Sequence, residues 1–342
     1  MRPTHALVGV FSMYFTIKLL AAVSLMFFGM IGTAYSQDKT LTWVGCGISK
    51  KAFMKEMAEA YYKKTGTKII LEGGGATKGI RMVSEGKADI GGSCRDVIHH
   101  SYLASPIKEE RWANMNPVAW DALAVIVHKD NVVSDISLQQ IKDLYKGKIT
   151  NWSQLGGANQ PIDLYIRKGK ISGVGATIRE LIFRNYTEEF IAKHTMPSSG
   201  PLEKGIEKNS AGIGITGISS ARRRDVKILK LDGIAPVYEQ IRDGKYALYR
   251  PLYLVTPLAT DVKPEVMDFH RFVMSDEGKA VMRKVGTVPH EDALPIWLIY
   301  LEKREAMMFD VGDDAPSAIN GVQKKAIKPQ ATGSDQANSL IR

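Results

Sequence analysis

The sequence predicts an α/β fold, because strand-like segments alternate along it with glycine-rich loops and amphipathic helices. Three units of this kind can be followed in order. The first unit is a strand at 41–44, a loop at 45–49 and a helix at 50–64. The second is a strand at 67–71, a loop at 73–77 and a helix at 78–84, and the third is a strand at 161–166, a loop at 172–177 and a helix at 177–184. Units connected in this way form a parallel sheet that binds ligands at the carboxyl ends of its strands.

The helix at 50–64 shows the clearest periodicity of the chain. Phe53, Met57 and Tyr61 recur at a spacing of four residues, which places them on one apolar face. Gly66 follows, and glycine commonly ends a helix because it adopts the left-handed conformation at little cost. The pattern therefore predicts a helix that packs on the sheet and ends at Gly66.

The remaining elements are predicted by shorter patterns. The continuous apolar run at 122–127 suits a strand that is covered on both faces. Ser137 is expected to cap a helix that extends to residue 145. Further strands are expected at 88–91, 212–215 and 251–255, and one long or two short helices at 263–285.

The three glycine-rich loops are candidate anion sites. The first N–H groups of a helix have no partner within the helix, and the helix dipole places partial positive charge there. Glycine lets an oxyanion approach the backbone, and Ser or Thr adds a hydroxyl donor. One such junction is weak evidence because Ser and Thr are also ordinary caps. Three of them predict that several helix starts converge on one anion.

Length and charge narrow the classes of function. The 342 residues suffice for about two domains, and the net charge of +10 suits an acidic partner. No nucleic-acid module is recognisable, the glycine loops lack the Gly-Lys-Ser/Thr ending of a nucleotide P-loop, and no Cys/His cluster has metal-ligand spacing. We therefore expect no cofactor, no metal, no nucleic-acid partner and no enzymatic activity.

The two ends of the chain differ in composition from its middle. Residues 1–36 resemble a secretory signal, with Arg2 and Lys18 before an apolar run and Ala34-Tyr35-Ser36 as a cleavage site. The apolar run is short for a membrane span, although an uncleaved anchor is the alternative. Residues 311–342 are polar and are expected to be disordered. Export would place the protein in the periplasm.

Cys46 and Cys94 are the only cysteines of the chain, and both are flanked by glycine-rich loops. An even pair in an oxidising compartment invites a disulfide, but two small buried thiols are the alternative. The sequence leaves this choice open, because it does not give the geometry that a disulfide requires.

Three motifs in the middle of the chain are distinctive. They are Gly-Lys-Ala-Asp-Ile-Gly at 86–91 followed by Ser-Cys-Arg-Asp at 93–96, Tyr-Lys-Gly-Lys-Ile-Thr-Asn-Trp at 145–152, and Ser-Ala-Gly-Ile-Gly at 210–214. Together they resemble the phosphate-binding proteins, a family of extracytoplasmic receptors of phosphate ABC importers, and the second motif is the most specific of the three. The likeness covers about residues 40 to 285.

This resemblance implies a two-lobed α/β fold of the type II periplasmic-binding-protein class, with a hinge between the lobes. On this chain, lobe one would comprise 38–121 plus 253–310, and lobe two 122–252. The resemblance further implies a monomer that captures inorganic phosphate and delivers it to a membrane ABC permease. The same fold could instead serve a sensor or scavenger of another oxyanion such as sulfate or molybdate, and a phosphatase is the least favoured reading.

The family motifs and the donor chemistry together give a candidate ligand site. Backbone N–H groups, hydroxyls, arginines and a carboxylate that would accept the phosphate proton are all expected there. The candidate residues are Ser49, Gly75, Ala76, Thr77, Asp89, Ser93, Cys94, Arg95, Arg167, Ser172, Gly173 and Val174. Ala76, Cys94 and Val174 stand where the family often has hydroxyl residues, and Thr177 could take over the role of Val174.

Several of these residues also have a purely structural reading. Arg95 could pair with Asp96 or Asp89, and Arg167 could lie on the surface. Ser49 and Thr77 could be ordinary helix caps. Asp89 could be a structural residue at a strand end, and Asp96 is the alternative proton acceptor.

Overall fold

A computed structural model describes residues 39–100 and 103–309, which form two α/β lobes joined along one extended sheet. The strand order is β2-β1-β3-β13-β6-β10-β8-β9, with β11 and β14 also paired to β6. The expected signal peptide, residues 1–36, and the expected disordered tail, residues 311–342, lie outside the described residues. Within the described part of the chain, no helix is both long and apolar enough to span a membrane.

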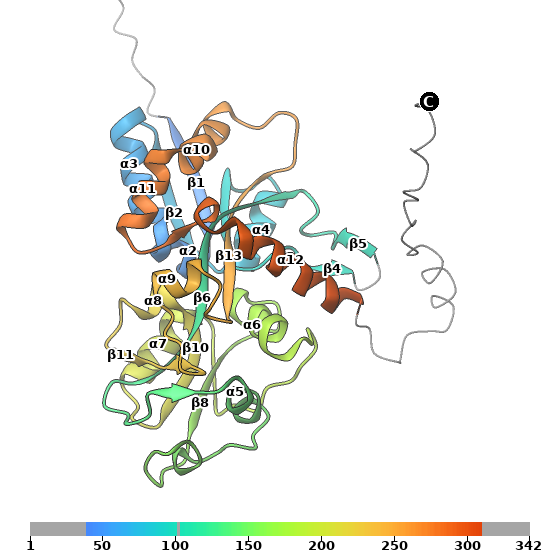
Figure 1. Ribbon diagram of the computed structural model, residues 1–342. Helices are drawn as coiled ribbons and strands as arrows, with labels where there is room; N and C mark the ends of the chain where they lie inside the picture. The colour runs from blue at the N-terminus through green and yellow to red at the C-terminus, as the bar shows by residue number, and fades with distance from the viewer. Residues whose placement is uncertain (1–38, 101–102, 310–342) are drawn as a thin grey trace, which may run out of the picture.

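Lobe one contains the parallel strands β1 (Thr40–Gly45), β2 (Lys68–Gly73) and β3 (Ile90–Ser93). Figure 1 shows α3 and α11 on one side of these strands and α4 on the other. The helices are α2 (Gly47–Ser49), η1 (Lys50–Met54), α3 (Lys55–Thr65), α4 (Ala76–Ser84), α10 (Pro264–Met274) and α11 (Asp276–Lys284). The predicted helix at 50–64 is thus the middle of a longer helical segment, and its apolar residues Phe53, Met57 and Tyr61 are buried.

The helical segment expected at 263–285 is two helices rather than one. Ser275 separates them, because its extended backbone ends α10 and its side chain caps α11 by accepting a hydrogen bond from the N–H of Gly278 at 3.2 Å. Gly66 ends α3 in the left-handed conformation, with φ of 73°. This agrees with the prediction made from its position after the apolar pattern.

Lobe two contains the strands β8 (Asp163–Arg167), β9 (His194–Met196), β10 (Gly212–Gly217) and β11 (Val226–Ile228). Its helices are α5 (Leu138–Tyr145), η2 (Trp152–Leu155), α6 (Gly173–Ile178), η3 (Arg179–Phe183), α7 (Ser199–Glu207), α8 (Ile218–Ala221) and α9 (Tyr238–Arg242). Ser137 caps α5 as predicted, and it forms a capping box with Gln140. Short strands complete the chain, namely β4 (His99–His100), β5 (Leu103–Pro106), β7 (Asp135–Ile136), β12 (Lys230–Leu231) and β14 (Val288–Pro289).

Two antiparallel strands connect the lobes, β6 (Ala113–His128) and β13 (Tyr249–Pro257). The first part of β6 pairs with β13 as far as Ala122, and its second part pairs with β10 from Leu123 onward. Figure 1 shows β6 running through both lobes. All residues from Val118 to Val127 are buried, in agreement with the continuous apolar run in the sequence.

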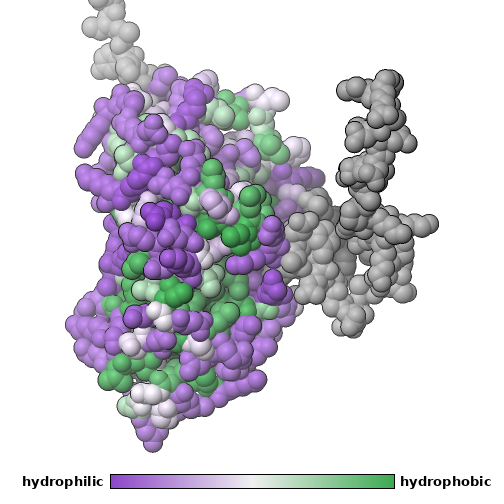
Figure 2. Space-filling model, in the orientation of Figure 1, coloured by the Kyte–Doolittle hydropathy of each residue, from purple (hydrophilic) through white to green (hydrophobic). Residues whose placement is uncertain are grey.

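The last described helix, α12 (Leu294–Phe309), contacts both lobes. The hydroxyl of Tyr300 donates to the Glu180 carboxylate of lobe two at 2.9 Å, and Arg304 pairs with Asp96 of lobe one at 2.6 Å. Figure 2 shows hydrophobic side chains on the outer surface of this helix, where Leu294 and Leu298 are exposed. Residues 253–310, expected to belong to lobe one, therefore include a helix that bridges the lobes.

Candidate functional site

The three glycine-rich loops meet where the lobes face each other. The N–H of Gly75, before α4, donates to the carbonyl of Gly45, the last residue of β1, at 3.2 Å. The hydroxyl of Thr77 donates to the carbonyl of Ile171, before α6, at 2.9 Å. The hydroxyl of Thr177 donates to the carbonyl of Cys94 at 3.1 Å. The convergence expected from the sequence is thus present, and it joins segments of both lobes.

Gly173 is a point where the two lobes pack closely. A Cβ atom at this position would lie 2.5 Å from the Sγ of Cys94 and 3.0 Å from the Cβ of Ala76. Such contacts are too short for any side chain at residue 173. The glycine in the sequence therefore lets the start of α6 pack directly against the lobe-one loops.

Several backbone donors at this junction are free. Among the described residues, the N–H groups of Ala76, Thr77, Gly173 and Val174 have no hydrogen-bond partner, as expected for the first positions of a helix. The N–H of Gly75, in contrast, is used by the carbonyl of Gly45. The structure thus corrects one expected donor and retains Ala76, Gly173 and Val174.

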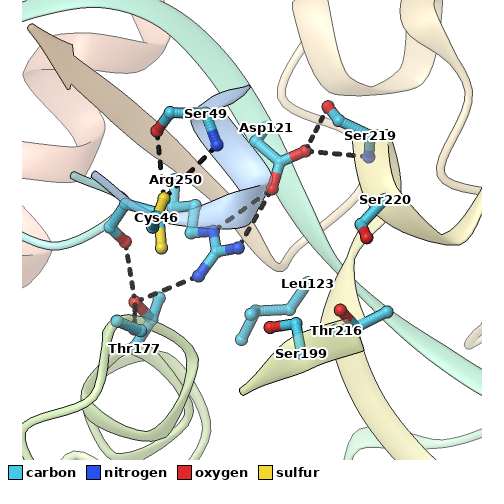
Figure 3. A network of polar contacts seen from close by, with 12 residues as sticks. Cys46, Ser49, Asp121, Leu123, Thr177, Ser199, Thr216, Ser219, Ser220 and Arg250 are labelled. Atoms are coloured by element: carbon cyan, nitrogen blue, oxygen red, sulfur yellow. Dashed lines mark hydrogen bonds and ion pairs between the residues drawn. The ribbon is translucent and has the colours of Figure 1, made fainter. Parts of the chain in front are cut away.

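A buried ion pair that the sequence reasoning missed lies beside these loops. The Nη2 of Arg250 is 3.0 Å from the Oδ2 of Asp121, and both side chains are almost fully buried. Ser219 donates to the other oxygen of Asp121 through its N–H at 3.1 Å and its hydroxyl at 2.7 Å. Figure 3 shows Arg250 between Asp121 and Thr177, with Nη1 of Arg250 3.4 Å from the Thr177 hydroxyl oxygen.

A sequence signal for this pair exists. Asp121 directly precedes the buried apolar strand at 122–127, and Arg250 precedes the apolar segment at 251–255. Burying a charged side chain at the start of a buried strand costs free energy unless an opposite charge pairs with it. Because the strands are neighbours, their charges meet at the boundary between the lobes.

Arg167 also faces this region, from the end of β8. Its Nη1 donates to Ser199 at 3.0 Å and its Nη2 to the carbonyl of Pro197 at 3.0 Å. Its Nε is buried and, among the described residues, has no partner. Burial lowers the pKa of Arg167, and nearby Arg250 opposes its charge as well. No salt bridge of Arg167 to a carboxylate occurs in the described residues, so a cationic donor remains available here.

Arg95 differs from Arg167 in having no free donor, so the structure corrects its expected role as a charged donor to the ligand. It forms a two-pronged salt bridge with the buried Glu110, at 2.7 and 2.9 Å. Its remaining N–H groups donate to the carbonyls of Ile171 and Asp96 and to the hydroxyl of Thr77. Every N–H of the guanidinium is therefore used within the protein. The partner of Arg95 is Glu110, not Asp96 or Asp89, so Arg95 fastens the ligand loops together.

The expected hydroxyl residues have specific local roles. The Ser93 hydroxyl donates to the carbonyl of Arg95 at 2.6 Å, and it closes the turn after β3. The Ser172 hydroxyl accepts from the N–H of Gly175 at 3.2 Å and caps α6. Ser49 and Thr77 do not cap their helices, because the caps are Cys46 and Gly75. Thr77 instead connects Arg95 of lobe one to Ile171 of lobe two.

The two expected carboxylates lie outside the junction. Asp89 is at the amino end of β3, where it accepts from the N–H and hydroxyl of Thr42 and pairs with Lys263 at 2.6 Å. Asp96 pairs with Arg304. Neither carboxylate is placed to receive a proton from a ligand at the junction, so the structure corrects this part of the predicted site. The carboxylate beside the loops is Asp121.

The two cysteines lie together in the lobe-one wall of the junction. Both are buried and both are free thiols. The Sγ of Cys46 accepts from the N–H of Ser49 at 3.3 Å. In the structure the two cysteines are thus reduced, and whether they can form a disulfide stays a prediction. No group of three or more potential ligands in the described residues could hold a metal ion.

Residues 34–277 match the model of the PBP superfamily domain. The chain belongs to the PBP superfamily. The phosphate-binding protein PstS of Bacillus subtilis (strain 168) is 29% identical over 225 residues, which cover 66% of this chain and 72% of that protein. PstS of Borreliella burgdorferi is 23% identical over 280 residues, covering 79% of this chain and 97% of that protein.

Solved structures of this superfamily confirm the two-lobed fold. A structure from Clostridium perfringens, described as a phosphate ABC transporter substrate-binding protein with bound phosphate, has a TM-score of 0.66 and 28% identity. The match covers 73% of this chain and 99% of the Clostridium perfringens chain. An ABC-type phosphate transport receptor from Vibrio cholerae has a TM-score of 0.56 and 24% identity, covers 73% of this chain and all of that one, and supports the fold alone.

Proposed function

We propose that this protein captures inorganic phosphate between its two lobes and delivers it to a membrane ABC permease. The observation that carries the proposal is the convergence of free helix-start N–H groups with Arg167, which has a buried and unpartnered Nε. Directed N–H donors and an arginine are the groups that hold an oxyanion without a metal. The similarity to PstS proteins and to a phosphate-bound relative supports phosphate as the oxyanion.

Binding would proceed by closure of the lobes about the two connecting strands. Because β6 changes its partner strand between Ala122 and Leu123, we place the hinge there and at Leu248, whose carbonyl accepts from the N–H of Leu123 at 2.9 Å. Closure brings Gly173 onto the lobe-one loops and excludes water, which strengthens each hydrogen bond to the anion. The protein would act in the periplasm as a monomer.

The proposed ligand groups are the N–H groups of Ala76, Thr77, Gly173 and Val174, with Arg167 as the charged donor. Arg250 would contribute positive charge to the pocket while Asp121 fixes its orientation. We assign to Thr177 the hydroxyl role that the sequence left open between Val174 and Thr177, because its hydroxyl contacts both Arg250 and the carbonyl of Cys94. These groups provide both charge and direction for a tetrahedral anion.

Calorimetric titration with phosphate, sulfate, arsenate and molybdate tests the proposal. We expect phosphate to bind tightly and arsenate to follow it, because the two anions share shape and protonation. Preference for sulfate or molybdate would assign the protein to another oxyanion. Absence of heat with every anion would refute the proposal. Turnover of a phosphomonoester would instead support the phosphatase alternative.

A further inference from the structure

Cys46 and Cys94 follow the ends of two neighbouring parallel strands, β1 and β3, at the edge where the glycine-rich loops meet. The register of β1 and β3 pairs Gly45 with Gly92, and the N–H of Cys46 donates to the carbonyl of Gly92 at 3.0 Å. The Ser49 hydroxyl lies 3.1 Å from the Sγ of Cys46 and donates to the carbonyl of Ser93 at 3.4 Å, so the Cys46 thiol lies beside the segment that carries Cys94. Since the chain has only two cysteines, each has the other as its only intramolecular partner for oxidation.

The hydrogen bonds give the two sulfur atoms different chemical roles. The Sγ of Cys46 caps the start of α2, where it accepts from the N–H of Ser49 at 3.3 Å and lies 3.1 Å from the Ser49 hydroxyl oxygen. A sulfur that accepts several hydrogen bonds is stabilised as a thiolate. Cys46 is therefore the nucleophilic member of the pair, and Cys94 is the resolving member.

The charges around the pair favour the same assignment. Arg250 on β13 and Arg167 on β8 face both thiols, while Asp121 on β6 is held by Arg250. Burial alone would raise the pKa of Cys46, but the hydrogen bonds from Cys94 and Ser49, with the charge of Arg250, lower it to about 6. The hydrogen bond to Cys46 and burial raise the pKa of Cys94.

We propose that Cys46 and Cys94 form a redox-active dithiol in the wall of the anion pocket, and that its oxidation to a disulfide strengthens anion binding. The part that concerns affinity rests on the proposed function, whereas formation of the disulfide does not.

The reaction is thiol–disulfide exchange with an external disulfide, such as that of a thiol oxidase or oxidised glutathione. The Cys46 thiolate attacks one sulfur of the external disulfide and releases the other as a thiolate. Cys94 then loses its proton and attacks the Sγ of Cys46, which expels the second external thiolate. The protein loses two thiol protons and two electrons in all, and the external disulfide becomes two thiols.

Oxidation changes the charge of the pocket. In the reduced state the Cys46 thiolate is a negative charge beside the helix starts, and it repels an incoming oxyanion. The disulfide carries no charge and releases the N–H of Ser49 from its bond to the thiolate.

Lobe closure also controls access to the pair. Both side chains are at most 4% exposed, and Gly173 of lobe two packs against the Sγ of Cys94. An external disulfide can reach Cys46 only when the lobes separate. Phosphate, which favours closure, should therefore slow the oxidation of the dithiol.

The experiment compares the full chain after reduction and after incubation with oxidised glutathione. Iodoacetamide labelling of the unfolded protein and intact mass give the number of free thiols, independently of any anion. Calorimetry with phosphate at pH 7.5 gives the affinity of each form. We expect the oxidised form to lose both thiols and to bind phosphate at least tenfold more tightly.

Two variants separate charge from cross-linking. Cys46→Ser removes the thiolate, so its affinity should equal that of the oxidised parent under reducing conditions. Cys94→Ser retains the thiolate and should bind weakly whether or not oxidant is present, once mixed disulfides are removed. Retention of both thiols by the parent in oxidant would overturn the dithiol. A disulfide with unchanged affinity would overturn the coupling, and a disulfide without any anion binding would overturn the proposed function and the coupling together.

Discussion

Arg95 and Arg167 lie on facing walls of the same junction, and their surroundings differ sharply. Arg95 is buried in lobe one and all its N–H groups bond to protein oxygens, chiefly the carboxylate of Glu110. Arg167 of lobe two has no carboxylate partner in the described residues and keeps a buried Nε free. The comparison shows that an arginine beside these loops can donate to a ligand only where its N–H groups are not already used within the protein.

The largest expected effect is on stability, from Arg95→Ala. This change removes the closer cationic partner of the buried Glu110 and leaves only Arg81, whose Nε is 3.4 Å away. Loss of one partner of a buried pair costs about 3–5 kcal/mol, and the remaining contact places the expected loss at the lower end. Chemical denaturation should show that decrease in the free energy of unfolding. The double variant Arg95→Met with Glu110→Leu should recover most of it. An unfolding curve equal to that of the parent for Arg95→Ala would contradict the structural role.

Arg167→Ala should act on binding instead. Loss of a charge-assisted hydrogen bond weakens anion binding by about 1.5–3 kcal/mol, or roughly 10- to 150-fold in Kd. The free energy of unfolding should change little, because Arg167 has no buried carboxylate to leave unpaired. Calorimetry with phosphate measures the affinity, and Lys168→Ala, an exposed neighbour of equal charge, is the matched control. Equal losses in both variants would point to general electrostatics rather than a specific contact.

Gly173→Ala tests whether the two walls must touch. Its new methyl group would lie 2.5 Å from the Sγ of Cys94, so closure requires displacement of one lobe. Overpacking of this kind costs about 1–3 kcal/mol, which should appear as weaker anion affinity. Gly47→Ala is the control, since a Cβ there meets nothing within 4 Å. If Gly173→Ala binds phosphate like the parent, closure does not use this contact.

The pH dependence of unfolding tests the ion pair that distinguishes Arg95 from Arg167. Burial would raise the pKa of Glu110, but the salt bridge with Arg95 lowers it below its ordinary value. The folded state thus favours the carboxylate, so its contribution is complete above the unfolded pKa of about 4.5 and is lost as the pH falls through the folded value. Denaturation between pH 7 and pH 3 should show a steeper acid loss for the parent than for Arg95→Met with Glu110→Leu. Parallel curves would contradict the coupling.

The sequence alone determined the α/β class, the three loop-to-helix junctions and their meeting at one site. These features are local or periodic, since glycine, caps and apolar spacing act through the backbone within a few residues. The family resemblance added the two lobes and the class of ligand. Ala76, Gly173 and Val174 were identified as donors because free N–H groups follow from the position of a helix start.

Only the tertiary structure decided how the polar side chains are paired. Arg95 meets Glu110, 15 residues away, and Arg250 meets Asp121, 129 residues away. Asp89 pairs with Lys263 and Asp96 with Arg304, and the two free thiols are both buried after neighbouring strands. A charged group or a thiol pairs with whichever side chain the fold places beside it, and that partner can be far away in the sequence. The role of such a residue therefore depends on the tertiary structure.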